Sequence, residues 1–369
     1  MLREYWYCLS FHRLCYSIPG SASLFFLDSE SISRTFPAGR YGPLPIPPRC
    51  DTIDPRRGLE VALLYPDQPS ASEPVPAAEP APGQKRKPTI PELQAARASG
   101  RRLTMVTAYD FAFARLVDQS PIDMILVGDS AAMTVLGHES TPPVTMVEML
   151  TLAKAVSRGA PHTFLVGDMP FMSYEATPAQ AVRNAGRYLQ EAAMDAVKLE
   201  GGRRIARTVA ALAAAGIPVM GHVGLTPQSA AQLGGYRVQG RDQAAAETLV
   251  DDALALQEAG VFALVVEAVP APVAAMLTGA LRVPTIGIGA GPDCTGQVLV
   301  LHDLLGLFEG FRPRFVKQYA DLASQTRAAL AAYAAEVAAG DFPGKAHSYG
   351  MPADEVAALR RRLGPPEEK

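Results

Sequence analysis

The chain has 369 residues, of which 48% are apolar and 19% are charged, with a formal net charge of −3. This balance is typical of a globular protein with a large core. No basic stripe indicates a nucleic-acid partner, and no run of 18 or more uncharged apolar residues predicts a membrane-spanning helix. We therefore expect a cytoplasmic protein with small-molecule partners, and neither nucleic acid nor a membrane among them.

Residues 1–85 differ in composition from the rest of the chain. Proline is so dense over 66–87 that it opposes both helix and sheet. The first thirty residues weakly imitate a signal peptide, but His12 and Arg13 interrupt the apolar run. We expect a poorly ordered extension and Pro-rich linker over 1–85, a catalytic domain over 86–350, and a C-terminal helix or tail over 351–369.

From residue 104 onward, short apolar runs alternate with helical stretches. The runs are apolar on both faces, as buried parallel strands are. They span 104–110, 124–130, 163–169, 196–202, 218–224, 263–269 and 284–291, with an eighth candidate around 296–306. Thr145 and Glu148 form a capping box before one helix, and Thr177 with Pro178 begins another. Further helices are expected over 203–215 and 244–260, and the alanine-rich 325–340 reads as a packing helix.

This alternation predicts an α/β fold, a (β/α)₈ TIM barrel with a mostly disordered N-terminal extension. The alternative is a doubly wound open sheet. A dinucleotide-binding sheet needs GxGxxG after its first strand, where this chain has TAYDFAFA. Its only glycine-rich turn, GIGAG at 287–291, comes late and lacks the full spacing, so the barrel is favoured.

Polar residues follow the apolar runs in a regular way. Six successive runs end on or beside an ionisable group: Asp110, Asp129 with Ser130, Asp168, Lys198 with Glu200, His222, and Glu267. Any one of them has a plain alternative as a helix N-cap or a loop charge. In a barrel, however, the carboxyl ends of all strands meet around one mouth, where catalytic groups lie. We therefore expect these side chains to form one site.

The residue types in this group favour a hard divalent cation. Asp129, Asp168 and Glu200 offer only oxygen ligands, which suit Mg²⁺. Lys198 and Glu200 are two residues apart on one strand, so they share a face; the lysine either neutralises an anionic substrate or only pairs with Glu200. Glu267, in an apolar strand, is a candidate proton acceptor. Together these residues describe a Mg²⁺-chelated 2-oxo acid whose enolate attacks a carbon electrophile.

The chain from about residue 87 to 350 closely resembles the ketopantoate hydroxymethyltransferase (3-methyl-2-oxobutanoate hydroxymethyltransferase) family. The resemblance rests on motifs in the family's order: TAYD, LVGDS, MTVLGHESTPPVTMVEM, DMPFMSY, VKLEGG, GHVGLTPQS, GGYRVQGR, GIGAG with GQVLVLHDLLG, and FVKQY. Glu139 and Pro142 depart from the commoner residues of the family, away from the proposed chemistry. The extension before residue 86 lies outside the resemblance.

The resemblance implies a (β/α)₈ barrel that transfers a hydroxymethyl group from 5,10-methylenetetrahydrofolate to 3-methyl-2-oxobutanoate. The products are 2-dehydropantoate, a precursor of pantothenate and coenzyme A, and tetrahydrofolate. It implies one Mg²⁺ per subunit and a large homo-oligomer such as a decamer. The implied roles are Mg²⁺ ligation by Asp129, Asp168 and Glu200, oxo-acid contact by Asp129, Ser130, Asp168 and Lys198, pocket lining by His222, and proton acceptance by Glu267.

Two other functions stay open at this point. A Mg²⁺-dependent C–C lyase acting on a 2-hydroxy diacid would use a similar barrel, although such lyases usually carry a reactive cysteine in a mobile loop, and here only Cys294 lies in the barrel region. A barrel that binds an oxo acid without turnover would need no Glu267. Arg237 and Arg241 in GGYRVQGR either meet the acidic tail of the folate or lie in a solvated loop.

Overall fold

The computed structural model describes residues 9–10, 13–16, 25–26 and 85–364. The three short ranges form a small antiparallel sheet of β1 (Leu9–Ser10), β2 (Arg13–Tyr16) and β3 (Phe25–Phe26). These strands were not predicted from the sequence. Apart from these short strands and Lys85, the segment expected to be a poorly ordered extension and linker lies outside the described residues.

Eight parallel strands close into a barrel, and each of the eight apolar runs supplies one strand. In chain order these are β4 (Leu103–Thr107), β5 (Met124–Val127), β6 (Phe164–Asp168), β7 (Ala196–Glu200), β8 (Val219–Gly224), β9 (Ala263–Glu267), β10 (Thr285–Ile288) and β11 (Gly296–Leu299). Each strand pairs with the next, and β11 returns to pair with β4. The TIM barrel is confirmed, and the open-sheet alternative is wrong.

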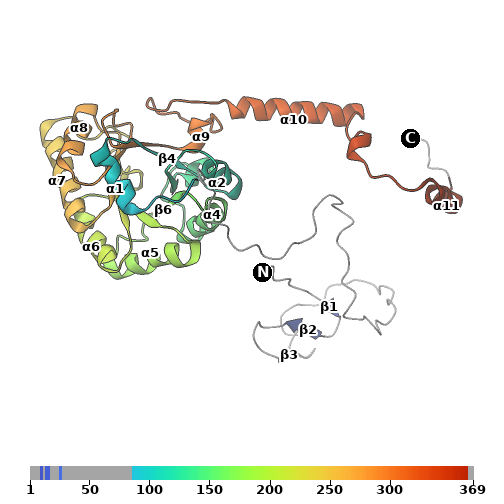
Figure 1. Cartoon of the computed structure of the whole chain (residues 1–369), viewed down its shortest axis with the longest axis horizontal. Helices are drawn as coiled ribbons and strands as arrows, with labels where there is room; N and C mark the ends of the chain where they lie inside the picture. The colour runs from blue at the N-terminus through green and yellow to red at the C-terminus, as the bar shows by residue number, and fades with distance from the viewer. Residues whose placement is uncertain (1–8, 11–12, 17–24, 27–84, 365–369) are drawn as a thin grey trace. The chain divides into compact units, whose positions relative to one another are not determined.

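Helices surround the strands, as Figure 1 shows. The longer ones beside the barrel are α2 (Phe111–Asp118), α4 (Met146–Gly159), α5 (Pro178–Ala192), α6 (Ala206–Ala214), α7 (Gln243–Ala259) and α8 (Ala271–Ala280). Short turns follow several strands: α3 (Ala131–Thr134), η3 (Arg203–Ile205), η4 (Pro227–Ser229) and α9 (Leu301–Leu304). The expected capping box of Thr145 and Glu148 is present, and Thr177 caps α5 ahead of Pro178.

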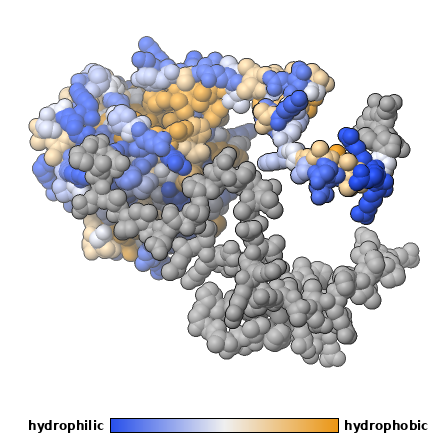
Figure 2. Space-filling view, turned by 45° about the vertical axis from the view of Figure 1, so that its right-hand side comes forward, coloured by the Kyte–Doolittle hydropathy of each residue, from blue (hydrophilic) through white to orange (hydrophobic). Residues whose placement is uncertain are grey.

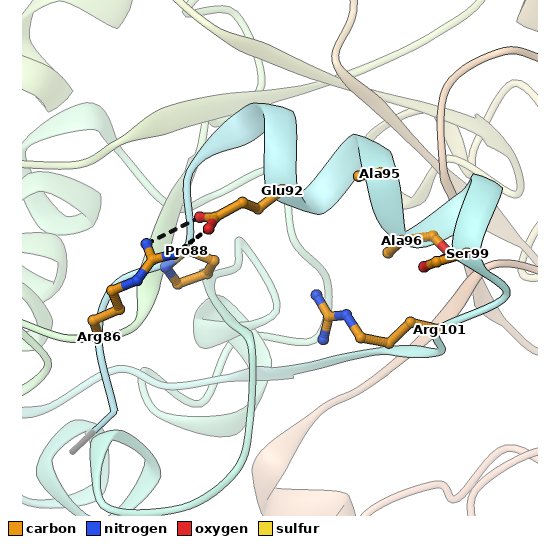
Figure 3. Close-up of a pocket in the computed structure, with 7 residues that line it drawn as sticks. All are labelled: Arg86, Pro88, Glu92, Ala95, Ala96, Ser99 and Arg101. Carbon is orange, nitrogen blue, oxygen red and sulfur yellow. Dashed lines mark hydrogen bonds and ion pairs between the residues drawn. The ribbon is translucent and has the colours of Figure 1, made fainter. Parts of the chain in front are cut away.

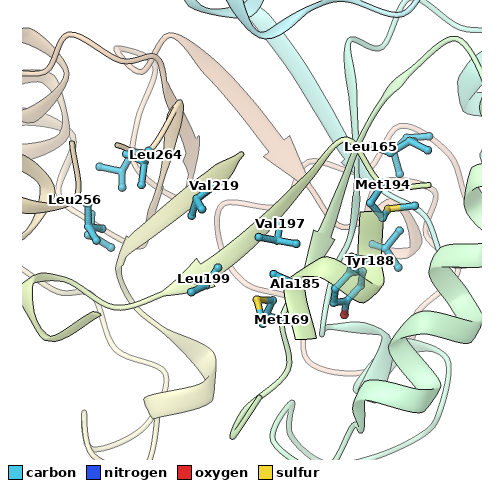
Figure 4. Close-up of a cluster of buried hydrophobic side chains, with 14 of the residues drawn as sticks. Leu165, Met169, Ala185, Tyr188, Met194, Val197, Leu199, Val219, Leu256 and Leu264 are labelled. Atoms are coloured by element: carbon cyan, nitrogen blue, oxygen red, sulfur yellow. The ribbon is translucent and has the colours of Figure 1, made fainter. Parts of the chain in front are cut away.

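The core has two parts. One lies between the strands and the outer helices and includes Leu165, Tyr188, Val197 and Leu264 (Figure 4). The other joins residues of all eight strands, among them the first strand residues Leu103, Met124 and Phe164, with Leu93 and Ala96 of α1 (Ile90–Ser99). Helix α1 therefore covers the amino-terminal end of the barrel, and the carboxyl-terminal end is left as the mouth where a site can form.

The alanine-rich segment does not pack as expected. It lies in α10 (Leu322–Ala339), which buries only Ala323, and it is followed by η5 (Lys345–His347) and α11 (Ala353–Leu363), which bury none of their residues. In the same part of the chain, Figure 2 shows apolar residues exposed on the surface. None of the helices in the described ranges is long and apolar enough to cross a membrane.

Candidate active site

The strand register brings the predicted residues to one mouth. Asp168 of β6 is aligned with Lys198 of β7, and Glu200 of β7 is aligned with His222 of β8. Glu267 ends β9, beside Gly224 at the end of β8. The prediction that these side chains lie together at the carboxyl ends of the strands agrees with this register.

Lys198 forms the centre of the charged cluster. Its Nζ lies 2.7 and 2.9 Å from the two carboxylate oxygens of Asp168 and 3.4 Å from Oε1 of Glu200. All three side chains are buried. Burial alone would lower the pKa of Lys198, but the surrounding carboxylates outweigh burial and raise it, so the lysine is charged at neutral pH. Burial raises the pKa of Glu200, yet attraction to Lys198 brings it down to about 2.

Asp129 lies beside Asp168 but forms no ion pair with a lysine among the described residues. Its backbone N–H donates to Oδ2 of Asp168 over 3.1 Å, and its Oδ2 accepts a 2.9 Å hydrogen bond from the side-chain amide of Gln228. Burial, followed by repulsion from Asp168 and Glu200, raises the pKa of Asp129 well above the ordinary aspartate value. A cation between these groups would relieve that repulsion.

His222 lies between two carboxylates. Its Nδ1 is 3.3 Å from Oε1 of Glu200, and its Nε2 is 3.3 Å from Oε2 of Glu267. Burial and Lys198 lower the pKa of His222, but the facing carboxylates prevail and raise it to about 9. Glu267 therefore has the His222 ring as its neighbour, which the apolar sequence around Glu267 did not indicate.

Local backbone geometry holds Glu267 in place. Gly224 has φ +96°, and a Cβ there would collide with the carbonyl oxygen of Glu267. Only glycine adopts this conformation freely and leaves room for such a close approach. The N–H of Leu225 donates to the same carbonyl over 2.9 Å. The ends of β8 and β9 are thus tied together beneath the candidate base.

Two tyrosines and a glutamine extend the site beyond the predicted residues. The Tyr109 hydroxyl lies 2.8 Å from Oγ of Ser130, and the Tyr174 hydroxyl donates to Oε1 of Gln228 over 2.8 Å. Gln228 lies in the GLTPQS motif, just after the end of β8. Its position as a polar residue close behind a strand end is the one feature of the sequence that could have identified Gln228 as part of the site.

One of the six predicted strand-end residues caps a helix and does not belong to the site. Asp110 is the N-cap of α2, and its side chain accepts a 2.8 Å hydrogen bond from the N–H of Phe113. An unpaired N–H at the start of a helix is satisfied by a carboxylate in this way. Asp110 is therefore structural, and no contact joins it to the Lys198 cluster within the described residues.

The donor set fits a divalent cation in part. The carboxylates supply hard oxygen ligands, and no described residue donates a hydrogen bond to Oδ1 of Asp129. Within the described part of the chain, however, no three His, Cys, Asp or Glu side chains already have the geometry of a metal site. Mg²⁺ commonly takes one or two carboxylates and keeps several waters, and this arrangement suits that mode better than a cage of three direct ligands.

A cavity of about 400 Å³ lies elsewhere, along α1 and the residues that flank it (Figure 3). Its charged residues are already paired, Arg86 with Glu92 and Arg101 with Asp123. None of the strand-end residues lines it. It is therefore separate from the cluster at the barrel mouth.

A closed parallel barrel with acids, a lysine and a histidine converging at the carboxyl ends of its strands defines an enzyme of the (β/α)₈ class. The family described as ketopantoate hydroxymethyltransferase matches residues 87–345. The chain is 57% identical over 274 residues to 3-methyl-2-oxobutanoate hydroxymethyltransferase of Heliobacterium modesticaldum, covering 74% of this chain and 99% of that relative. It is 60% identical over 266 residues to the enzyme of the same name from Moorella thermoacetica, covering 72% and 99%.

Among solved structures, phosphoenolpyruvate phosphomutase from Streptomyces platensis subsp. rosaceus is similar with a TM-score of 0.48 and 15% identity, covering 74% of this chain and 99% of that one. The relatives named above decide the family. The chain belongs to the ketopantoate hydroxymethyltransferase family, and it is an enzyme, a transferase of one-carbon groups.

Proposed function

We propose that the enzyme transfers a hydroxymethyl group from 5,10-methylenetetrahydrofolate to 3-methyl-2-oxobutanoate, giving 2-dehydropantoate and tetrahydrofolate for pantothenate biosynthesis. The observation that carries this proposal is the convergence of four carboxylates with one buried lysine and one histidine at a single barrel mouth. It occurs in a chain 57% and 60% identical to two relatives named for this transfer.

The proposal includes one Mg²⁺ per subunit, held by Asp129, Asp168 and Glu200 directly or through water. Support comes from the oxygen-only donor set and from Oδ1 of Asp129, which accepts no hydrogen bond from the described residues. When bound, the ion would polarise the keto group of the oxo acid and so acidify the neighbouring C–H.

The remaining residues bind and orient the oxo acid. Lys198 carries the positive charge that an anionic substrate needs, and its contacts with Asp168 hold that charge in place. Asp129, Ser130 and Asp168 would contact the substrate beside the ion, and the Ser130 hydroxyl is oriented by its 2.8 Å contact with Tyr109. His222 would line the pocket from its place between Glu200 and Glu267.

Glu267 is the proton acceptor in this proposal. Its carboxylate removes the proton from C3 of the oxo acid. Water adds to the methylene carbon of the folate and both C–N bonds break, which releases tetrahydrofolate and leaves formaldehyde in the site. C3 then bonds to the formaldehyde carbon, and the proton taken up by Glu267 goes to the oxygen that becomes the hydroxyl of the product. Nε2 of His222 lies 3.3 Å from Oε2 of Glu267, so the histidine ring is placed to orient the carboxylate of the base.

Hydrogen–deuterium exchange tests the role of Glu267 without the folate. With Mg²⁺ and 3-methyl-2-oxobutanoate in D₂O, we expect the wild type to exchange the C3 proton, followed by NMR. Glu267→Gln should slow this exchange by about 10²-fold or more, because a positioned general base contributes that much. Glu258→Gln, an exposed glutamate on α7, is the matched control and should exchange normally.

Two results would contradict the proposal. Exchange at the wild-type rate in Glu267→Gln would place the base elsewhere. A wild type that binds the oxo acid without exchanging its proton would favour a binding barrel over a transferase.

A further inference from the structure

Gln228 occupies a central position in the site, although neither the sequence reading nor the family resemblance gives it a role. It lies in η4, directly after Pro227, and its side chain is buried. From there it reaches the loops or ends of three other strands. It is neutral, so its effect must come through hydrogen bonds and not through charge.

Four hydrogen bonds converge on this residue. Its Nε2 donates to Oδ2 of Asp129 over 2.9 Å and to the carbonyl oxygen of Met169 over 3.0 Å. Its Oε1 accepts from the Tyr174 hydroxyl over 2.8 Å. Its backbone N–H donates to Oε2 of Glu200 over 3.1 Å. One residue thus links the candidate ligands after β5 and on β7 with the loop after β6.

The chemistry of the partners fixes which way the amide points. The Asp129 carboxylate and the Met169 carbonyl can only accept hydrogen bonds, so both must face the NH₂ end of the amide. The Tyr174 hydroxyl accepts from the Glu200 N–H over 3.2 Å, and of its two possible acceptors Oε1 of Gln228 at 2.8 Å lies closer than the carbonyl oxygen of Glu200 at 3.2 Å. Tyr174 therefore holds the amide in the one orientation that serves Asp129.

This arrangement has a consequence for the acids. Oδ2 of Asp129 and Oε2 of Glu200 are engaged by Gln228, while Oδ1 of Asp129 stays available. Without the amide, no other described residue on this side would hold the Asp129 carboxylate, and repulsion from the neighbouring buried carboxylates would turn it away from this position.

We propose that Gln228 is a positioning residue, whose side-chain amide, held by the Tyr174 hydroxyl, fixes the Asp129 carboxylate so that Oδ1 can bind a divalent cation. This inference rests on the proposed function, because it requires the cation. It assigns Gln228 no contact with substrate. Its effect should appear first in cation affinity.

The test is cation binding in the absence of substrates, measured by titration calorimetry with Mg²⁺ and by electron paramagnetic resonance with Mn²⁺. Gln228→Met keeps the length of the side chain and removes the donor. We expect its Kd to rise about 10- to 100-fold, the usual loss when a hydrogen-bond partner of a metal ligand is removed. Turnover should recover largely at saturating Mg²⁺, which a merely misfolded site would not do.

Tyr174→Phe is the second variant, and it removes the hydroxyl that donates to the side-chain amide of Gln228. It should weaken cation binding in the same direction, and in the Gln228→Met background it should add nothing further, since both act through one hydrogen-bond chain. Gln257→Met is the matched control. Gln257 is as buried as Gln228, but it lies on α7, where its side-chain oxygen accepts a hydrogen bond from the backbone N–H of Arg282. Its Kd should equal that of the wild type.

The outcomes separate the two proposals. A wild type that binds neither Mg²⁺ nor Mn²⁺ overturns the metal-dependent function, and the positioning role with it. A wild type that binds while Gln228→Met binds equally well overturns the positioning role alone. If Gln228→Met does not fold, wild-type affinity in Tyr174→Phe overturns the positioning role.

Discussion

At the residue scale, the buried charges of the mouth depend on one another. Lys198 contacts both oxygens of Asp168 and one of Glu200, and all three side chains are almost fully buried. Removing one partner of a buried ion pair leaves an uncompensated charge, which costs far more than losing a surface pair. This site is therefore a place where function and stability rest on the same contacts.

We predict that Lys198→Met lowers the free energy of unfolding by about 3–5 kcal/mol. The reason is that Asp168 and Glu200 lose their only lysine in a buried site. Lys154→Met is the control, since Lys154 pairs with Glu191 on the surface and its loss should cost about 0–1 kcal/mol. Urea denaturation of the metal-free proteins measures both, and equal losses would contradict the account of the cluster.

At the element scale, the chain uses LVGD twice, at the ends of β5 and β6, for two different reasons. A Cβ on Gly167 would collide with the ring of Tyr188, whose hydroxyl donates to the carbonyl oxygen of Asp168. A Cβ on Gly128 would come within 2.9 Å of Oγ of Ser130 and would make ordinary contacts with the side chain of Leu126, at 3.5 Å and beyond. The first glycine makes room for a buried aromatic ring, whereas the second faces a single small hydroxyl group, which can shift more easily than a ring.

Gly167→Ala should therefore destabilise the protein more than Gly128→Ala does. We expect a loss of about 1–3 kcal/mol for Gly167→Ala, typical of overpacking in a core, and a smaller loss for Gly128→Ala. Thermal unfolding followed by circular dichroism compares them. Gly128→Ala being the more destabilising would show that the Tyr188 contact is not what requires the glycine.

Most of the fold could be predicted from the sequence because its signals are local. Each barrel strand is a short apolar run, and the helix starts at Thr145 and Thr177 carry their caps in the adjacent residues. What failed depends on tertiary contacts. The alanine-rich pattern of α10 indicates a helix, but nothing in it specifies what the helix packs against.

The candidate site could be predicted to the extent that ionisable residues mark strand ends. Asp129, Asp168, Lys198, Glu200, His222 and Glu267 all carry that mark and all converge. Asp110 carries the same mark yet caps a helix, because a carboxylate also satisfies backbone N–H groups. Gln228 carries no charge, and its importance comes from partners far away in the chain, such as Asp129 and Tyr174.

At the scale of the whole molecule, the C-terminal part leaves an apolar face exposed. Leu330, Tyr333 and Val337 are spaced along one side of α10, with exposed fractions of 61%, 56% and 46%. The family resemblance implies a large homo-oligomer, which stays a prediction here. An exposed apolar helix face is where such an assembly would bury surface.

We expect the wild type to be larger than a monomer in light scattering. Replacing Leu330, Tyr333 and Val337 together with lysine should reduce the assembly, because three charges would have to be buried at the contact. Ala328→Lys with Ala335→Lys places charges on the opposite side of α10 and should leave the mass unchanged. A monomeric wild type, or a triple variant with unchanged mass, would contradict this prediction.

The central claim is the hydroxymethyl transfer itself, and direct product formation tests it. The purified full-length chain is mixed with Mg²⁺, 3-methyl-2-oxobutanoate and 5,10-methylenetetrahydrofolate, and 2-dehydropantoate is measured by mass spectrometry. We predict product that depends on the folate, that falls sharply on chelation of the metal, and that is lost in Glu267→Gln. Absence of 2-dehydropantoate from folded protein with its cation verified bound would contradict the account.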